Sequence, residues 1–167
     1  MPPFLATPQG YSHLKGTERL AVTFRHPTTL FPVRETFISG VGQVSPDGTR
    51  IVTVPADGRA RIVDAASGQI VKLLVGHSKS VKSASFSPDG KHIVTTSEDT
   101  TARVWDAESA QTILTLHGGE ELFAATFSHD GKRIVTAGED RTARVWRADT
   151  EQLLTVLKGH ERAVASA

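Results

Sequence analysis

One stretch of 21 residues occurs three times in this chain. It reads "SPDGTRIVTVPADGRARIVDA" from Ser45, "SPDGKHIVTTSEDTTARVWDA" from Ser87 and "SHDGKRIVTAGEDRTARVWRA" from Ser128. Two further landmarks keep the same register: an arginine that opens the last part of the stretch, and a glycine after the following apolar run. They stand at Arg61, Arg103 and Arg144, and at Gly76, Gly118 and Gly159. All three series advance by 42 and then 41 residues, a period that indicates stacked copies of one supersecondary unit.

The middle copy has the pattern of four short strands separated by turns, at residues 81–87, 92–98, 101–107 and 111–117. The first strand ends at a Pro-Asp-Gly turn, where proline presets φ and glycine accepts a positive φ. Ile93 and Val94 are adjacent apolar residues, which predicts a strand covered on both faces, as when small sheets stack. Recurring Gly, Pro and β-branched residues argue against helices. The sequence therefore predicts an all-β fold.

Composition excludes several classes of function. Nineteen Lys and Arg face eighteen Asp and Glu, and a net charge of +1 gives no electrostatic footprint for nucleic acid or an anionic membrane. The absence of cysteine excludes disulfides and thiolate metal sites. No apolar run approaches the roughly 20 residues that span a bilayer, and the first residues lack the features of a signal peptide. We therefore expect a cytoplasmic protein without a cofactor and without a nucleic-acid or membrane partner.

The repeat resembles the WD-repeat β-propeller family. The family's Gly-His element is present at Gly76-His77 and Gly159-His160, its Trp-Asp ending at Trp105-Asp106, and its repeat of roughly 40–45 residues matches the period here. The resemblance covers about residues 37–163 and implies three four-stranded antiparallel blades, at about 38–75, 81–117 and 122–158. Closed propellers have four to eight blades, so the resemblance implies an incomplete propeller. The near-identity of adjacent units suggests recent duplication, as in bacterial-looking arrays.

The resemblance also implies a buried hydrogen-bonded set of His, Thr, Asp and Trp within each blade. The middle unit has all four members: His77, Thr95, Asp99 and Trp105. A buried imidazole, carboxylate and indole each need a partner. A chain of them satisfies all three groups and fixes the turn between the second and third strands.

The set is less complete in the flanking units. Gly119 stands at the histidine position of the third unit, where His117, two residues away, is an open alternative. Val63 stands at the tryptophan position of the first unit, which has no histidine in register, and Arg147 follows the third unit's tryptophan. We therefore expect the network to weaken on either side of the middle blade. The members that remain are Thr136, Asp140, Trp146, Thr53 and Asp57.

The two ends of the chain depart from the repeat. Residues 1–36 are interpreted as an irregular or eroded segment with one strand around Leu20–Phe24. Residues 164–167, "VASA", align with the opening of the middle blade and predict the start of a truncated fourth blade. An unclosed stack exposes an apolar blade face at each end, and such faces favour self-association.

Three candidate chemical sites carry simpler structural interpretations. Histidines recur along the repeats, but they lack His-Glu-x-x-His spacing, so we interpret His77 and His160 as structural rather than as metal ligands. Asp99 and Asp140 occupy equivalent positions of different blades, which predicts separate turns and not a catalytic pair. The Gly-rich segment 40–45 lacks the lysine and the helix of a phosphate loop.

The remaining candidate site is surface. In the family, the loops before the first strand and between the second and third strands open on one rim, which commonly binds proteins. We expect a non-enzymatic scaffold or interaction module with a protein or peptide partner. The alternatives are a fragment of a larger propeller without independent activity, or an enzyme built on a propeller. The candidate rim residues are Lys79, Ser80, Glu98, Glu120, Glu121 and Glu139.

Overall fold

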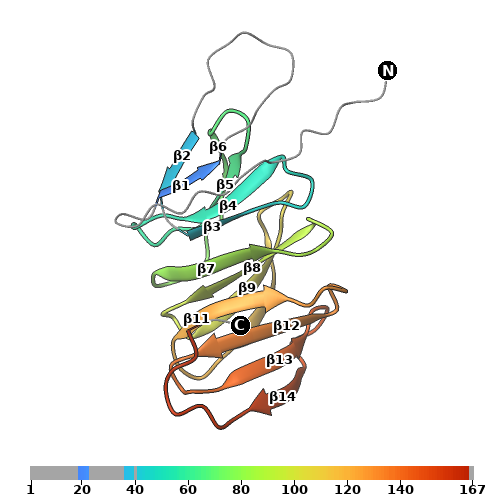
Figure 1. The fold of residues 1–167 in the computed structure, drawn as a ribbon. Coiled ribbons are helices and arrows are strands. Elements are labelled where there is room, and N and C mark those ends of the chain that lie inside the picture. Colours follow the sequence, from blue (N-terminus) through green and yellow to red (C-terminus); the bar gives the residue numbers. More distant parts are fainter. Residues whose placement is uncertain (1–18, 23–35, 40, 166–167) are drawn as a thin grey trace.

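The computed structural model describes residues 19–22, 36–39 and 41–165, and all regular structure in them is β (Figure 1). Three four-stranded sheets and one two-stranded sheet are formed. The prediction of an all-β chain with three four-stranded antiparallel sheets is confirmed, and the propeller is not closed. Figure 1 shows the three sheets lying one below another, from turquoise through green and yellow to red.

We call the three sheets blades 1, 2 and 3. Each is a meander in which neighbouring strands in sequence pair antiparallel. Blade 1 contains β3 (Val41–Val44), β4 (Arg50–Val54), β5 (Arg61–Asp64) and β6 (Ile70–Leu73). Blade 2 contains β7 (Val81–Phe86), β8 (His92–Ser97), β9 (Thr101–Asp106) and β10 (Thr112–His117). Blade 3 contains β11 (Leu122–Phe127), β12 (Arg133–Gly138), β13 (Ala143–Arg147) and β14 (Leu153–Leu157).

The repeated Ser-x-Asp-Gly turn has one hydrogen-bonded structure in every blade. In blade 2 the Ser87 hydroxyl donates to Asp89 at 2.5 Å, and the same carboxylate oxygen accepts the Lys91 amide at 3.0 Å. The His92 amide in turn donates to the Ser87 hydroxyl at 2.9 Å. Equivalent bonds form in the turns that begin at Ser45 and Ser128. Local side-chain bonds of this kind fix the turn and so fix the register of the first two strands.

Two hydrophobic cores of matching composition lie between the blades. Each is formed by one face of the upper blade and the opposite face of the blade below it, and equivalent residues fill equivalent places. Between blades 1 and 2 the core includes Val52, Ile62 and Leu74 against Phe86, Ile93 and Trp105. Between blades 2 and 3 it includes Val94, Val104 and Leu116 against Phe127, Ile134 and Trp146. The adjacent apolar residues of the second strand therefore serve two cores, one on each face.

The outer face of blade 1 is not open, so the expectation of an exposed blade face at this end is wrong. Ile51, Val63 and Ala65 point away from blade 2, yet their exposed fractions are only 0%, 5% and 2%. A hairpin of β1 (Arg19–Val22) and β2 (Thr36–Ser39) precedes blade 1, and β2 lies against β4. The expected N-terminal strand is present in part as β1, and the rest of the segment 1–36 is almost entirely outside the described residues.

The outer face of blade 3 remains open in the described structure. Leu157 stands where Leu116 stands in blade 2, but it is 50% exposed while Leu116 is 0% exposed. Val164 and Ala165, expected to open a fourth blade, are not in a strand, and residues 166–167 lie outside the described part. The Val164 amide instead donates to the Gly138 carbonyl at 3.1 Å. The last described residues thus return to the end of β12.

Candidate functional site

The structure brings the four predicted residues of blade 2 into one hydrogen-bonded chain. His77 Nδ1 lies 2.8 Å from Asp99, and its Nε2 lies 2.7 Å from the Thr95 hydroxyl. Trp105 Nε1 donates to the same hydroxyl at 2.8 Å. Asp99 also accepts the Ser78 amide at 3.0 Å and the Thr101 hydroxyl at 2.6 Å. The chain therefore ties the loop before β7, strands β8 and β9, and the turn between those strands.

Protonation states follow from the environment of this chain. Burial lowers the pKa of His77 despite the nearby Asp99 carboxylate, and favours a neutral imidazole. Burial alone would raise the pKa of Asp99, but hydrogen bonds from Thr101, His77 and the Ser78 amide outweigh it and lower this pKa to about 2. A neutral ring beside a carboxylate donates from Nδ1, which leaves Nε2 to accept the Thr95 hydroxyl proton. All four side chains are satisfied in this single arrangement.

Among the residues that the structure describes, blades 1 and 3 have no histidine beside the turn aspartate, and an arginine takes its place. In blade 3 the Arg144 guanidinium donates to Asp140 at 2.5 Å and to the Thr142 hydroxyl at 2.7 Å. In blade 1 Arg61 donates to Asp57 in the same way. Trp146 still donates to Thr136 at 2.9 Å, so blade 3 keeps that half of the network. The network is therefore split in blade 3, with the indole pair and the carboxylate pair satisfied separately.

The corresponding arginine of blade 2, Arg103, lies beneath Gly76 and is displaced from the aspartate by His77. A Cβ on Gly76 would lie 2.8 Å from the Arg103 guanidinium and 3.0 Å from the Trp105 ring. Only glycine fits at this approach without movement of the neighbours. The other two glycines of the series have different surroundings: a Cβ on Gly118 would lie 2.5 Å from the Leu122 side chain, and one on Gly159 would meet no atom within 4 Å.

Two of the predicted rim residues pair with Lys82, a residue that no feature of the sequence singled out. Lys82 on β7 lies 2.5 Å from the Glu98 carboxylate and 3.2 Å from that of Glu121. These two glutamates raise the pKa of the Lys82 ammonium group. Since Glu98 belongs to blade 2 and Glu121 precedes blade 3, the three side chains join the two blades at the rim.

The other predicted rim residues lie at the same end of the blades. The Glu139 amide donates to the Glu121 carbonyl at 2.9 Å, which places the β12–β13 turn beside the loop before β11. Ser80 accepts the Glu98 amide through its carbonyl at 3.0 Å. The side chains of Lys79, Ser80, Glu120 and Glu139 are exposed. The rim is therefore a continuous polar surface around the second-to-third-strand turns.

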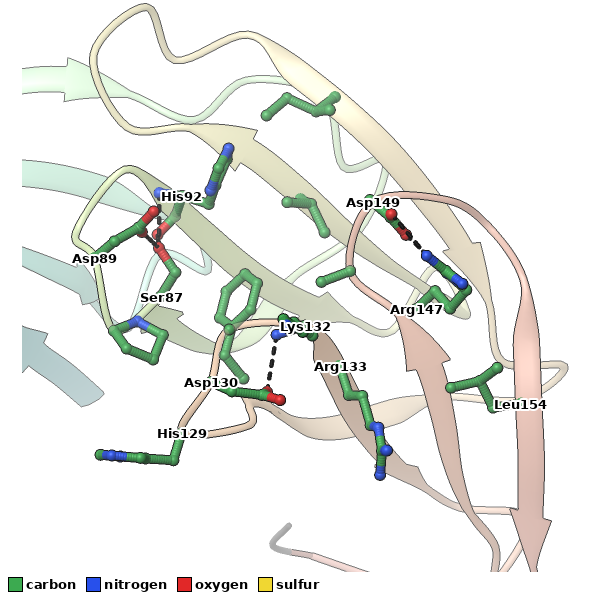
Figure 2. A pocket seen from close by; sticks show the side chains of 16 residues that line it. Ser87, Asp89, His92, His129, Asp130, Lys132, Arg133, Arg147, Asp149 and Leu154 are labelled. Atoms are coloured by element: carbon green, nitrogen blue, oxygen red, sulfur yellow. Dashed lines mark hydrogen bonds and ion pairs between the residues drawn. The ribbon is translucent and has the colours of Figure 1, made fainter.

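Two cavities open at opposite ends of the blades. A cavity of about 450 Å³ lies at the rim, where the turn that contains Asp57 and Gly58 faces the loop that contains His77 and Lys79. A larger one of about 790 Å³ lies between blades 2 and 3 at the other end, beside the Ser-x-Asp-Gly turns (Figure 2). Its walls come from β8–β10 and their turns on one side, and from β11–β14 on the other.

A metal site and a membrane-spanning helix are both absent from the residues that the structure describes. No group of three or more His, Asp or Glu side chains there is placed to hold a metal ion. No helix in the same ranges is long and apolar enough to cross a membrane.

Stacked four-stranded meanders with a His-Thr-Asp-Trp chain define a repeat protein of the β-propeller class. Residues 68–106 and 109–147 match the family model described as WD domain, G-beta repeat. These two segments are WD repeats, and the resemblance identified in the sequence is confirmed. Each matched segment contains the last strand of one blade and the first three strands of the next. No curated protein matches the sequence.

Three kinds of residue at these sites escaped the sequence analysis. The first kind is the recurring arginine, Arg61, Arg103 or Arg144, which served only as a landmark of the repeat. Its fixed distance from the turn aspartate was a usable signal that the two side chains pair. Lys82 carries no repeat signal, because Gly40 and Phe123 stand at the corresponding positions of the first and third units. Contacts that join two blades, such as those of Gln43, are also invisible within one repeat. Gln43 accepts the Phe86 amide at 2.6 Å and the Ser85 hydroxyl at 3.0 Å.

Acid will destabilise blade 2 in two steps. Below pH 6.5 the unfolded chain protonates His77 while the native state, with its lowered pKa, does not, so the free energy of unfolding falls. Between pH 3.8 and about 2 the unfolded Asp99 takes up a proton before the native one, which removes about 2 kcal/mol more. Urea unfolding from pH 8 to pH 2, followed by Trp105 fluorescence in Trp146→Phe, measures both. His77→Gln serves as the control that removes the first step, and a flat profile would contradict the assignment.

Proposed function

We propose that the chain is an interaction module that holds a protein or peptide partner on the rim of its blades. WD repeats suggest an interaction or scaffold role, and the chemistry of the described residues supports it. The side chains of the His-Thr-Asp-Trp chain bond to one another and stabilise a turn, so they are not available to a partner. Exposed polar groups at the loops before the first strands and at the second-to-third-strand turns remain available to a partner.

The observation that carries the proposal is the Glu98–Lys82–Glu121 group. Its two ion pairs join blades 2 and 3 at the rim, so the surface of one blade continues into that of the next. Glu120 and Glu139 extend the surface with exposed carboxylates. A partner with basic and hydrogen-bond-donating groups complements such a surface.

The proposal is tested with a peptide selected from a random display library on the immobilised chain. Fluorescence anisotropy then measures the dissociation constant for the chain and for the Glu98→Gln/Glu120→Gln/Glu139→Gln variant. We expect the variant to bind about tenfold or more weakly, since each lost charge contact at a rim contributes a fraction of that change. Glu151→Gln, at the opposite end of blade 3, is the matched control. Equal binding by both variants would overturn the rim as the site.

We further propose self-association through the open face of blade 3. This face repeats the one that blade 2 buries against blade 3, and it exposes Leu157, where the counterpart Leu116 is fully buried. Exposed apolar area of this kind favours pairing when a matching surface is present. Sedimentation over a dilution series measures it, with the Leu157 variant described below as the comparison.

A further inference from the structure

A partly buried arginine joins blades 1 and 2 at the end opposite the rim. Arg50, at the start of β4, donates from its guanidinium to the carbonyls of Gly90 at 3.0 Å and Ala107 at 3.1 Å. The guanidinium carbon lies 5.8 Å from the centre of the Phe86 ring. The Nη1 atom lies 3.9 Å from the Glu108 carboxylate. Blade 2 therefore presents four groups that together recognise a guanidinium: two carbonyls, an aromatic face and a carboxylate.

Blade 3 carries the same four groups in the same register. Each lies 41 residues further along the chain: Phe127, Gly131, Ala148 and Asp149. The turns around them also pack alike at the two interfaces. A Cβ on Gly90 would lie 3.4 Å from Pro46 of blade 1, and one on Gly131 would lie 3.8 Å from Pro88 of blade 2. The second interface therefore repeats the geometry of the first. We call these four groups of blade 3 the guanidinium site.

No side chain from blade 2 fills the guanidinium site. The residue in register with Arg50 is His92, whose imidazole is shorter and has no guanidinium fork. The cavity of about 790 Å³ lies here, and His92, Phe127 and Asp149 line it. Phe127 is only partly buried, whereas its counterpart Phe86 is 4% exposed. Among the described residues, no hydrogen bond is made to the carbonyls of Gly131 or Ala148.

The charged groups around the cavity are arranged so that an additional cation can bind. Arg147 is already paired with Asp149 through two bonds of 3.0 Å. In Figure 2 the side chains of His129 and Arg133 point away from the wall that carries Ser87, Asp89 and His92. Two further carboxylates, Asp89 and Asp130, stand on the turns at the cavity's edge, and each keeps one oxygen outside the turn's own hydrogen bonds. The Lys132 side chain is the remaining cation on this wall.

We propose that the cavity between blades 2 and 3 binds the guanidinium group of an arginine side chain presented by a peptide partner. The fork donates to the carbonyls of Gly131 and Ala148, the Phe127 ring covers one face, and Asp149 is shared with Arg147. Val104, Ile113 and Leu154 line the cavity and accept the methylene groups of the arginine or an apolar neighbour in the peptide. The site lies at the opposite end from the rim and does not depend on the function proposed there.

The test is an NMR titration of the ¹⁵N-labelled chain with N-acetyl-arginine amide, and in parallel with N-acetyl-lysine amide. We expect saturable shifts of the Gly131, Ala148 and Asp149 amides with the arginine probe. The lysine probe is expected to bind about tenfold or more weakly, because an ammonium cannot reach both carbonyls as the planar fork does. Absent or equal shifts with the two probes would overturn the proposal.

Two variants at position 92 separate binding from folding. His92→Arg supplies the guanidinium from within the chain, as Arg50 does, so we expect it to abolish the arginine-induced shifts and to raise the urea midpoint. His92→Gln leaves the cavity open and should retain the shifts even if the arginine variant folds poorly. His129→Gln, which changes a histidine that points away from the cavity, is the control and should bind as the unaltered chain does. Undiminished shifts in a folded His92→Arg protein would contradict the site.

Discussion

Replacement of Asp99 with alanine will lower the free energy of unfolding by about 2–4 kcal/mol, because a buried hydrogen-bond donor left without a partner costs about 1–3 kcal/mol. The Asp99 side chain is 6% exposed and accepts bonds from His77, Thr101 and the Ser78 amide. Alanine leaves the buried His77 and Thr101 donors without an acceptor, while water can replace the lost bond at the exposed Ser78 amide. The neighbouring residue, Glu98, pairs with Lys82 at the half-exposed rim, and its replacement with alanine should change stability by less than about 1 kcal/mol.

Urea unfolding of the two alanine variants measures the difference. The Asp99→Asn variant adds a finer comparison, because an amide oxygen still accepts bonds but carries no charge, so its midpoint should fall between those of Asp99→Ala and the unaltered chain. Equal shifts for Asp99→Ala and Glu98→Ala would show that the hydrogen-bonded chain does not stabilise blade 2.

Replacement of Leu116 with alanine will lower the free energy of unfolding by about 2–5 kcal/mol. This leucine is the last but one residue of β10, is 0% exposed and lies in the core between blades 2 and 3 with Leu122 and Trp146, so its removal leaves a cavity in that core. Leu157 is the matched control, since it has the same side chain at the same place in the repeat but is 50% exposed. Leu157→Ala should therefore change the stability of the monomer by about 0.5 kcal/mol or less.

The Leu157 variant also reports on the open face of blade 3. If that face mediates self-association, sedimentation across a hundredfold dilution should show weaker association for Leu157→Ala than for the unaltered chain. The same association by both proteins would exclude this face. A stability loss as large as that of Leu116→Ala would instead mean that Leu157 is covered in solution.

The features that could be predicted from the sequence are those that recur in every repeat. The three sheets and most strand positions follow from turns and β-branched runs that recur with a fixed period. The partners of Thr95 and Trp105 follow from the family's pattern, and their hydrogen bonds are present in the structure. Arg144 as the partner of Asp140 was not anticipated, because the expected histidine was treated as missing rather than as replaced by another cation.

What the sequence did not reveal depends on contacts between units. The pairing of Lys82 with Glu121 joins two blades, as does the donation by Arg50 to Gly90 and Ala107. A repeat compared only with its own copies gives no sign of either contact. The burial of Ile51 and Val63 was missed for the same reason, since the expectation of an open face considered only the repeated part of the chain.

The two interfaces between blades differ in the number of hydrogen bonds that cross them, and this difference affects the order in which the blades unfold. Arg50 and Gln43 bond across the first interface to backbone atoms of blade 2, while their counterparts at the second, His92 and Ser85, make no such bond to blade 3 among the described residues. Stability in a repeat array is close to a sum of unit and nearest-neighbour terms. The Lys82–Glu121 ion pair also crosses the second interface, but it lies at the partly exposed rim and contributes little. We therefore expect blade 3 to open as a separate unit, with amides that exchange with solvent while blades 1 and 2 remain folded.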